Sequence, residues 1–273
     1  YDLKNEIESL SSNNIDNFNA NNLCFFVPEY VLLLNHKKLE IKTYNSKSIC
    51  DQFVNSFDFS PFPTQKLNIN FNRRDTRNGY LKKIKKIKEY IQKGDIYEIN
   101  YCQEFYSNEV NIFPEPIFLE LNKIMKTPFS SFLKLQDKYI LSSSPERFLR
   151  KSGNYILSQP IKGTRKRGVN KSEDRSLINN LENSTKDFSE NIMIVDLVRN
   201  DLSISAKNSL VKVEELCKVY TFEKVHQMIS SISSEIDDDM HFFRVLKGAF
   251  PMGSMTGAPK IRAMEIIDKF EGF

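Results

Sequence analysis

The chain has 273 residues, of which 40% are hydrophobic and 27% charged, an ordinary composition for a soluble globular protein of one large domain or two small ones. The formal net charge of +4 permits an anionic ligand but does not demand nucleic acid. The 4 cysteines are scattered without metal-site spacing, which predicts reduced thiols in a cytoplasmic protein. No apolar run approaches the roughly 18 residues that cross a membrane, and no signal peptide is visible.

The first part of the chain predicts an irregular lead-in followed by a small sheet. Residues 1–22 are rich in Asn, Ser and Asp, and residues 55–79 hold two prolines among many Asn and Arg residues, so both stretches predict loops. Between them, three apolar runs predict antiparallel strands at 23–27, 30–34 and 39–44. The chain starts with Tyr1 instead of Met and ends at Phe273 without an obvious stop signal, so we expect a fragment.

An amphipathic helix is predicted over residues 81–91, ending near Gly94. Its apolar face consists of Leu81, Ile84, Ile87 and Ile91, and its other face carries Lys82, Lys83, Lys85, Lys86 and Lys88. A nucleic-acid-binding protein could use such a face. No aromatic residues that stack on bases lie between the lysines, so a solvated helix covering a core is favoured.

Strands arranged in hairpins follow, separated by helices. Alternation predicts a strand at 95–106, and Pro114 and Pro116 open a helix that reaches Met125. Two hairpins are predicted, one from 129–135 with 139–143 and one from 148–151 with 155–158. This order predicts a mixed α/β (α+β) fold and argues against a doubly wound parallel sheet.

The stretch 159–168, Gln-Pro-Ile-Lys-Gly-Thr-Arg-Lys-Arg-Gly, has the make-up of a ligand-binding loop. Pro160 fixes φ, Gly163 allows close approach of the backbone to an anion, and Thr164 adds a hydroxyl group. The alternative is a solvated basic turn. However, Lys162 lies on the apolar side of the cluster, and a lysine in a drier place beside other cations has a lowered pKa and can act as a nucleophile.

Glu146 lies at a predicted strand junction, and the following hairpin leads directly to Lys162. The two side chains are therefore predicted to face one pocket. A carboxyl group near a lysine can donate or accept a proton if burial tunes its pKa. The alternative is a surface ion pair between Glu146 and Arg147, which would contribute little to stability.

A mostly buried helix is predicted over residues 188–202, with Asp187 and Glu190 on one side of its first turn. Two interpretations stay open. Acidic residues stabilise a helix N-terminus through the helix dipole. They also suit a hard cation, because Mg²⁺ commonly binds one or two protein carboxylates and completes its shell with water and substrate oxygens.

The last part of the chain predicts three strands, at 210–214, 218–222 and 225–236. His226 falls in the last of them, and a lone histidine is more often a core residue than a catalyst. A helix at 237–250 and another at 261–270 flank the stretch 251–260, Pro-Met-Gly-Ser-Met-Thr-Gly-Ala-Pro-Lys. Backbone N–H groups and hydroxyls at a helix N-terminus suit a carboxylate or phosphate, although this stretch is not a P-loop.

Six of these stretches together resemble one family, the chorismate-utilising enzymes. They are Gly-Asp-Ile-Tyr-Glu-Ile-Asn at 94–100, Ser-Pro-Glu-Arg-Phe at 144–148, Pro-Ile-Lys-Gly-Thr-Arg at 160–165, Glu-Asn-Ile-Met-Ile-Val-Asp-Leu-Val-Arg-Asn-Asp-Leu at 190–202, Val-His at 225–226, and 250–265. Each is weak alone, but they follow the family order over residues 80–273. The resemblance implies two packed antiparallel sheets with helices on the outside. Residues 1–79 would then form the N-terminal sheet and lead-in of the fold, and 80–273 a chorismate-binding catalytic portion, truncated at its C-terminal end.

The residue at position 162 subdivides the family. The anthranilate synthase group usually has a small residue there, whereas a lysine resembles the aminodeoxychorismate synthase component I group. The resemblance implies a Mg²⁺-dependent enzyme that converts chorismate and ammonia to 4-amino-4-deoxychorismate, for para-aminobenzoate and folate synthesis. Lys162 would attack ring carbon C2 while Glu146 protonates the departing 4-hydroxyl, and ammonia would then add at C4 and release the lysine. A glutamine amidotransferase subunit would supply the ammonia.

Other residues acquire roles only through the resemblance. Glu190 resembles the family's metal ligand, with Asp187 supporting it, and His226 resembles its active-site histidine. The substrate-binding positions would be Gly163, Thr164, Ser254, Gly257, Ala258 and Lys260; Ser254 stands where many members have Thr. The family's later substrate-binding arginine and tyrosine and its second metal glutamate have no counterpart here. Anthranilate synthase component I, a truncated non-catalytic homologue and, least favoured, a nucleic-acid-binding protein stay open as alternatives.

Overall fold

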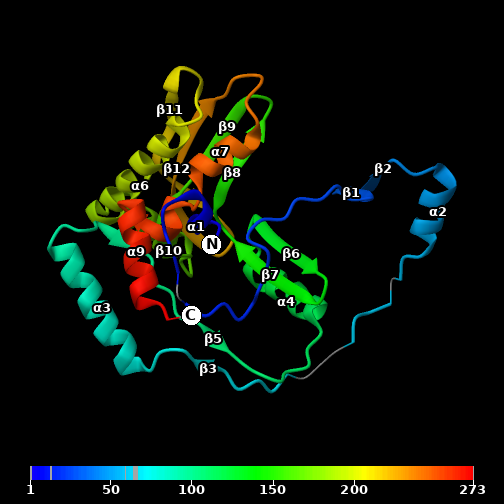
Figure 1. The fold of residues 1–273 in the computed structure, drawn as a ribbon, viewed down its shortest axis with the longest axis horizontal. Helices are drawn as coiled ribbons and strands as arrows, with labels where there is room; N and C mark the ends of the chain where they lie inside the picture. Colours follow the sequence, from blue (N-terminus) through cyan, green and yellow to red (C-terminus); the bar gives the residue numbers. More distant parts are fainter. Residues whose placement is uncertain (1, 13, 59, 64–66, 273) are drawn as a thin grey trace.

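The computed structural model describes residues 2–12, 14–58, 60–63 and 67–272, and it is built around one antiparallel sheet (Figure 1). This sheet contains β8 (Arg147–Ser152), β9 (Tyr155–Gln159), β10 (Ile161–Lys166), β11 (Val211–Thr221) and β12 (Val225–Glu235). Strands β9 and β10 lie end to end along one edge of β12, and β11 pairs with its other edge. Pro160 joins β9 to β10, and its carbonyl still accepts from Ser230 N at 3.2 Å, so the two strands remain aligned with β12.

Helices α5 (Lys171–Glu182) and α6 (Thr185–Ser203) pack on this sheet, and α7 (Phe242–Ala249) packs on α6. The hydrophobic core lies between α6 and the sheet and includes Ile156, Ile194, Val198 and Ile232. Burial of these apolar side chains is the main term that stabilises the arrangement. Ser184 caps α6, because its side chain accepts from Asp187 N, which satisfies a donor at the helix start.

A second, smaller core lies beside the first. It is formed by α3 (Arg77–Gln92), β4 (Glu98–Ile99), α8 (Gly253–Thr256), β13 (Gly257–Ala258) and α9 (Lys260–Phe270). Its interior is filled by Ile87 of α3, by Ile96, and by Ala263 and Ile266 of α9. The antiparallel pair β4–β13 brings residues 98–99 against 257–258, although they lie far apart in the sequence.

The remaining elements are peripheral. They are α1 (Lys4–Ile7), β1 (Tyr30–Asn35), β2 (Lys38–Thr43), α2 (Lys47–Asn55), β3 (Asn72–Arg73), β5 (Phe105–Tyr106), α4 (Pro114–Met125), β6 (Phe129–Leu135), β7 (Lys138–Ser144) and the 3₁₀ helix η1 (Lys207–Ser209). Figure 1 shows β1, β2 and α2 as an arm that stands away from the main sheet. Among the residues that the structure describes, every helix is too short or too polar to traverse a lipid bilayer.

The predicted fold class is confirmed as a mixture of helices and antiparallel sheets, the sheets other than the main one being two-stranded in the described residues. Both predicted hairpins and the helix at 114–125 form. The continuous strand at 95–106 is wrong, since only β4 and β5 form there, and the loop predicted at 159–168 contains β10. The strand at 23–27 does not form either, and the helix predicted at 237–250 is confined to α7.

The proposed division into 1–79 and 80–273 stays a prediction. Positions 59 and 64–66 of the predicted surface crossing, and the two terminal residues, lie outside the described residues.

Candidate active site

The side chain of Lys162 is aimed by a β-bulge in β10. Ile161 pairs with Ile229 and Thr164 with Gln227, so two residues of β10 between these pairs lie opposite one residue of β12. Gly163 supplies the left-handed backbone that the bulge needs, with φ at 92°. A Cβ added to Gly163 would lie 2.9 Å from Cβ of Asp187, so α6 also excludes a side chain there. Bulges commonly redirect a side chain beside an active site.

The amine of Lys162 lies in a largely enclosed place between two other segments. Its Nζ donates to the carbonyl oxygen of Ser254 at 3.2 Å and lies 3.3 Å from Oε1 of Glu98. The Lys162 side chain is 17% exposed and that of Glu98 is 14% exposed. The Lys162 side chain is thus partly buried and not part of a solvated basic turn, but the charged group beside its amine is the carboxylate of Glu98 and not another cation.

Ser254 joins Lys162 to Glu146. Its hydroxyl donates to Oε1 of Glu146 at 2.6 Å, and its carbonyl accepts from Lys162. The same Glu146 oxygen accepts from Ile161 N at 3.2 Å. Burial raises the pKa of Glu146 above its usual value, although the hydrogen bonds from Ser254 and Ile161 and the charge of Lys162 oppose the rise. The structure therefore brings together the acid and the amine that the sequence placed in one pocket.

Glu98 is a member of the site that sequence reasoning did not single out. It lies on β4, which pairs with β13, and Asn100 Nδ2 donates to the Ser254 carbonyl at 2.8 Å. The pairing needs Gly257, because a Cβ there would lie 2.4 Å from the carbonyl oxygen of Glu98. Burial raises the pKa of Glu98, the charge and hydrogen bond of Lys162 lower it, and the charge of Glu190 raises it further.

The two predicted metal ligands lie at the start of α6 and differ in their surroundings. Oδ2 of Asp187 is 2.7 Å from an amino nitrogen of Arg165. Burial disfavours the Asp187 carboxylate, but the bonds from Ser184 and Arg165 outweigh it and lower its pKa. Glu190 is 33% exposed, and only Lys186, 3.6 Å away and itself exposed, pairs with it as an ion pair in the described part of the chain.

These surroundings fit Glu190 as a single-carboxylate ligand for Mg²⁺, which often binds through one protein carboxylate plus water and substrate. Asp187 is already held by Arg165. No group of three or more His, Cys, Asp or Glu side chains in the described residues could hold a metal on its own. The assignment of Mg²⁺ stays a prediction.

His226 is fully buried in β12, and both ring nitrogens have partners within the protein. Nε2 lies 2.8 Å from Oδ1 of Asp174, and Nδ1 lies 2.9 Å from the hydroxyl of Thr221. Asp174 also accepts two hydrogen bonds from Arg167 and one from Gly168 N, and Arg167 holds the pKa of Asp174 well below its usual range. This network ties α5 to the sheet. The catalytic role of His226 stays a prediction.

The remaining predicted substrate-binding residues lie in three different structural environments. Gly257 and Ala258 are buried in the β4–β13 pair next to Glu98, and Thr164 is exposed on β10. Lys260 Nζ is 2.8 Å from Oδ1 of Asp201, and their side chains are 11% and 6% exposed, so this amine is engaged with α6. Burial raises the pKa of Asp201 to about 6, against the opposing effect of Lys260.

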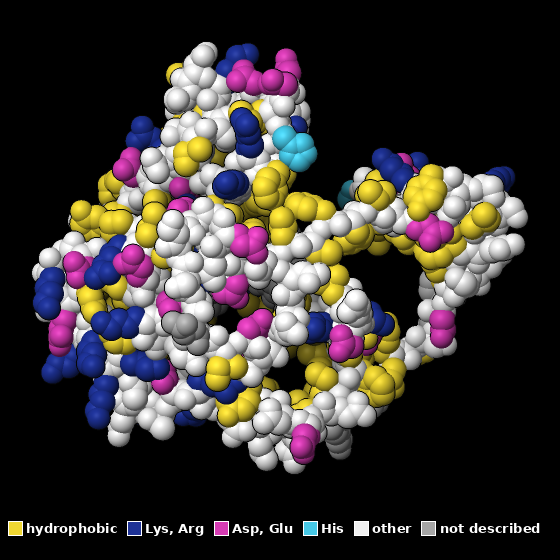
Figure 2. Space-filling model, in the orientation of Figure 1, with side chains coloured by type: hydrophobic (Ala, Val, Ile, Leu, Met, Phe, Trp, Pro, Cys, Tyr) yellow, Lys and Arg dark blue, Asp and Glu magenta, His cyan; other side chains and the backbone are white. Residues whose placement is uncertain are grey.

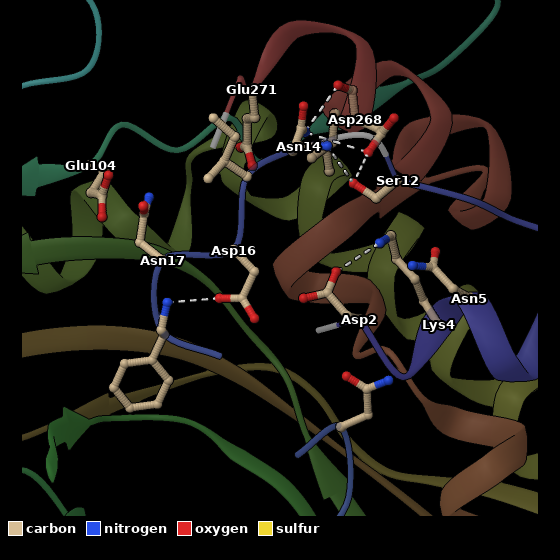
Figure 3. Close-up of a pocket in the computed structure, with 14 residues that line it drawn as sticks. Asp2, Lys4, Asn5, Ser12, Asn14, Asp16, Asn17, Glu104, Asp268 and Glu271 are labelled. Carbon is tan, nitrogen blue, oxygen red and sulfur yellow. Dashed lines mark hydrogen bonds and ion pairs between the residues drawn. The ribbon is translucent and has the colours of Figure 1, made fainter. Parts of the chain in front are cut away.

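Two hollows of about 470 Å³ each are candidate entrances for a substrate. One is lined by Glu146 with residues of β6, β7, β8 and α7, including Phe129 and Ser144. The other lies between the N-terminal segment and α9, where Asp2, Lys4, Asp16, Asp268 and Glu271 converge (Figure 3). Glu146 lines the first hollow but not the second, and Lys162 lines neither, so the first hollow reaches the site from the side of the acid.

Comparisons with known proteins show the family of the chain. A family model described as chorismate binding enzyme matches residues 1–273. Aminodeoxychorismate synthase component 1 of Escherichia coli (strain K12) is 37% identical over 273 residues, covering 99% of this chain and 60% of that protein. Anthranilate synthase component 1 of Bacillus pumilus is 38% identical over 192 residues, which are 70% of this chain and 37% of that protein.

The fold also matches solved structures. Anthranilate synthase component I from Streptococcus pneumoniae TIGR4 superimposes with a TM-score of 0.85 at 23% identity, covering 100% of this chain and 64% of that one. The chain spans about 60% of the length of the E. coli relative. The family model, the order of the motifs and the enclosed Lys162–Glu146 pair lead to one conclusion: the chain belongs to the family of chorismate binding enzymes.

Proposed function

We propose that the protein acts as an aminodeoxychorismate synthase component I, which makes 4-amino-4-deoxychorismate from chorismate and ammonia. The observation that carries the proposal is the enclosed amine of Lys162, linked through Ser254 to the buried carboxyl of Glu146. A lysine partly withdrawn from water can act as an amine nucleophile, and a nearby carboxyl group can supply the proton that the leaving group needs. Relatives named aminodeoxychorismate synthase component 1 support the same activity, at 33% to 37% identity in three bacteria.

The two side chains would divide the chemistry. The amine of Lys162 forms a bond to ring carbon C2, the ring double bonds shift, and the C4–O bond breaks. Glu146 gives its proton to the departing oxygen, which leaves as water. Burial raises the pKa of Glu146, and a raised pKa keeps the proton that a general acid must donate. Ammonia then bonds to C4, the double bonds shift back, and the C2–N bond to Lys162 breaks.

Glu190 would hold Mg²⁺ in this scheme. When bound, the ion offsets the negative charge of a dicarboxylate substrate. A glutamine amidotransferase subunit would deliver the ammonia, and the designation of the relatives as component 1 supports the existence of a partner. The four cysteines are unpaired, which supports the cytoplasmic location that belongs to this proposal.

Intact mass spectrometry tests the proposal directly. The protein is mixed with Mg²⁺ and chorismate without ammonia, and we expect a covalent species heavier by chorismate less one water. Lys162→Ala should abolish it, whereas Lys212→Ala, a change in a lysine that the site does not use, should leave it intact. Adding an ammonium salt should discharge the adduct and release 4-amino-4-deoxychorismate.

Anthranilate synthase component I is the second candidate, because relatives with that name reach 38% identity. That reaction needs no lysine nucleophile. Formation of anthranilate by both the unaltered protein and Lys162→Ala, with no adduct in either, would establish this alternative and reject the first.

A further inference from the structure

Among the residues that the structure describes, the charged group that forms an ion pair with the amine of Lys162 is Glu98, from a different part of the chain. Their ion pair spans 3.3 Å, and both side chains are less than one-fifth exposed. Apart from this ion pair, Oε1 of Glu98 is buried without a hydrogen-bond donor in the described residues. A carboxylate oxygen left in this state retains its capacity to accept a proton.

We propose that Glu98 is the base that removes the proton from the Lys162 ammonium group before attack and returns it after release. The inference rests on the proposed function, since it concerns the step that generates the nucleophile. An ammonium group has no lone pair, so Lys162 cannot bond to carbon until one of its neighbours takes a proton.

The other acidic groups that face this region are less suited to the task. Glu146 Oε1 is occupied by Ser254 and Ile161, and Glu146 must hold its own proton for the departing hydroxyl. Glu190, on α6, is one-third exposed and pairs with Lys186. Burial also raises the pKa of Glu98, which makes its carboxylate a stronger proton acceptor than an exposed one.

The proton balance closes over the cycle. Glu98 takes one proton from Lys162, giving a neutral amine and a neutral carboxyl group. The amine bonds to C2, Glu146 supplies the proton for the hydroxyl that leaves as water, and the new C2–N group carries a positive charge. Ammonia bonds to C4, and Lys162 leaves as a neutral amine. Glu98 then returns its proton to Lys162, and the ammonium group on C4 reprotonates Glu146.

A merely structural ion pair predicts the opposite effect of substitution. A carboxylate that only stabilises the ammonium form makes the free amine harder to generate, so removing the carboxylate would free the amine and speed the attack. A base predicts that the same substitution slows the attack. The sign of the change therefore separates the two roles.

The experiment measures the rate of adduct formation by rapid quenching and intact mass spectrometry, with Mg²⁺ and chorismate but no ammonia. For Glu98→Gln we expect a rate about 100-fold lower near neutral pH, in the range that loss of a general base produces. Glu98→Asp keeps a carboxylate and should retain an intermediate rate. Glu120→Gln is the matched control, because Glu120 and Lys123 form an exposed pair at 3.5 Å, and its rate should not change.

Equal or faster adduct formation in folded Glu98→Gln overturns the proposal, while the adduct in the unaltered protein still upholds the proposed function. If the unaltered protein forms no adduct, the proposed function itself fails. Should both Glu98 variants prove unfolded by circular dichroism, the pH profile and the buffer dependence of the unaltered protein decide. A base predicts a rate that rises in the acidic range as the carboxyl ionises. Dependence on solvent predicts a rate that increases with the concentration of an added buffer base at fixed pH, and that result would refute the proposal.

Discussion

Ser254 contributes to the site through two chemically separate groups. Its hydroxyl donates to Glu146 and its carbonyl accepts from Lys162 and Asn100. The residue is 3% exposed, so none of these three hydrogen bonds competes strongly with water. A single position therefore fixes the distance between the acid and the amine, while only its side chain affects the ionisation of the acid.

Substitution of Ser254 should shift the pH dependence of the reaction. Ser254→Ala removes a donor that lowers the pKa of Glu146, so that pKa should rise. Glu146 then keeps its proton to a higher pH, and the alkaline limb of adduct formation should move upwards. Loss of the bond should also lower the free energy of unfolding by about 1 kcal/mol. Ser254→Thr keeps the hydroxyl and serves as the control. An unmoved alkaline limb in Ser254→Ala would remove Glu146 from the role of acid.

The buried pair Asp201–Lys260 predicts a pH-dependent stability. The folded pKa of Asp201 is raised to about 6 from an ordinary 3.8, so the folded state binds this proton more tightly than the unfolded state. The stabilisation from this carboxyl group is therefore fully present below about pH 4 and is lost as the pH rises through about 6.

Lys260→Met should make this dependence steeper, because it leaves the Asp201 carboxylate buried without its partner. We expect destabilisation of about 3 kcal/mol at pH 7, measured by urea unfolding. The loss should shrink at pH 5, where the carboxyl group takes up a proton. Equal losses at both pH values would show that Asp201 stays ionised in the variant.

At the scale of elements, the bulge in β10 connects fold to chemistry. It turns Lys162 towards β4 and α8, while Arg165, one residue past Thr164, returns to the face covered by α5 and α6. Helix α6 also constrains the bulge, because it approaches Gly163 too closely for any side chain to fit at that position. The position of the amine is thus a property of the strand and not of a flexible loop.

Gly163→Ala should therefore destabilise the protein by more than backbone strain alone would. Its φ of 92° disfavours any side chain, and the new Cβ would meet Asp187 at 2.9 Å and Leu181 at 3.0 Å. We expect a loss of about 3 kcal/mol in the free energy of unfolding and a large drop in the adduct rate. Gly153→Ala is the control, since its φ is 57° but nothing lies within 4 Å of the added Cβ. It should lose only about 1 kcal/mol, with the adduct rate unchanged. Similar losses at the two glycines would contradict the argument.

The same elements show how much of the fold can be predicted from the sequence. Local patterns are sufficient for α4 and for the hairpins β6–β7 and β8–β9, because their periodicity and turn residues are contiguous. They fail at 159–168, where Pro160 and Gly163 signal a loop but pairing with β12 maintains a strand. They fail at Glu98 for a related reason. Its partners Gly257 and Ala258 lie far along the chain, and no local pattern reports that contact.

The site residues follow the same division. Lys162 and Glu146 were placed together because one hairpin separates them. The binding of Ser254 to both was not predicted, and neither was the pairing of Asp187 with Arg165 or of Lys260 with Asp201. An ion pair between distant elements leaves no spacing signature, so Ser254 and Lys260 were predicted as ligands of the substrate, and Asp187 as a metal ligand or a helix-dipole partner.

At the scale of the whole molecule, the protein consists of a compact body and an exposed arm. Figure 2 shows open space between the arm and the body, with hydrophobic side chains along it and Lys and Arg side chains gathered over α3 on the opposite side. Phe25, Phe26 and Val27, which lead into the arm, are all exposed, as are Leu32 to Leu34 of β1. A two-stranded hairpin with so little burial is marginally stable by itself.

Hydrogen exchange should separate the two parts. We expect the amides of β1 and β2 to exchange with little protection, and those of β9 and β12, which line the main core, only through global unfolding. Mass spectrometry of peptic peptides measures both in one sample. Equal protection in the hairpin and in β12 would show that the arm is stabilised by contacts beyond its own pairing.

The contact of the Lys162 amine with a main-chain oxygen has an evolutionary corollary. Every amino acid at position 254 brings the same carbonyl, so replacement there cannot erase the anchor of the nucleophile, whereas it can readily retune the acid. Substitutions at position 254 during evolution would thus change the pH optimum of the enzyme, while the nitrogen of Lys162 would keep its position.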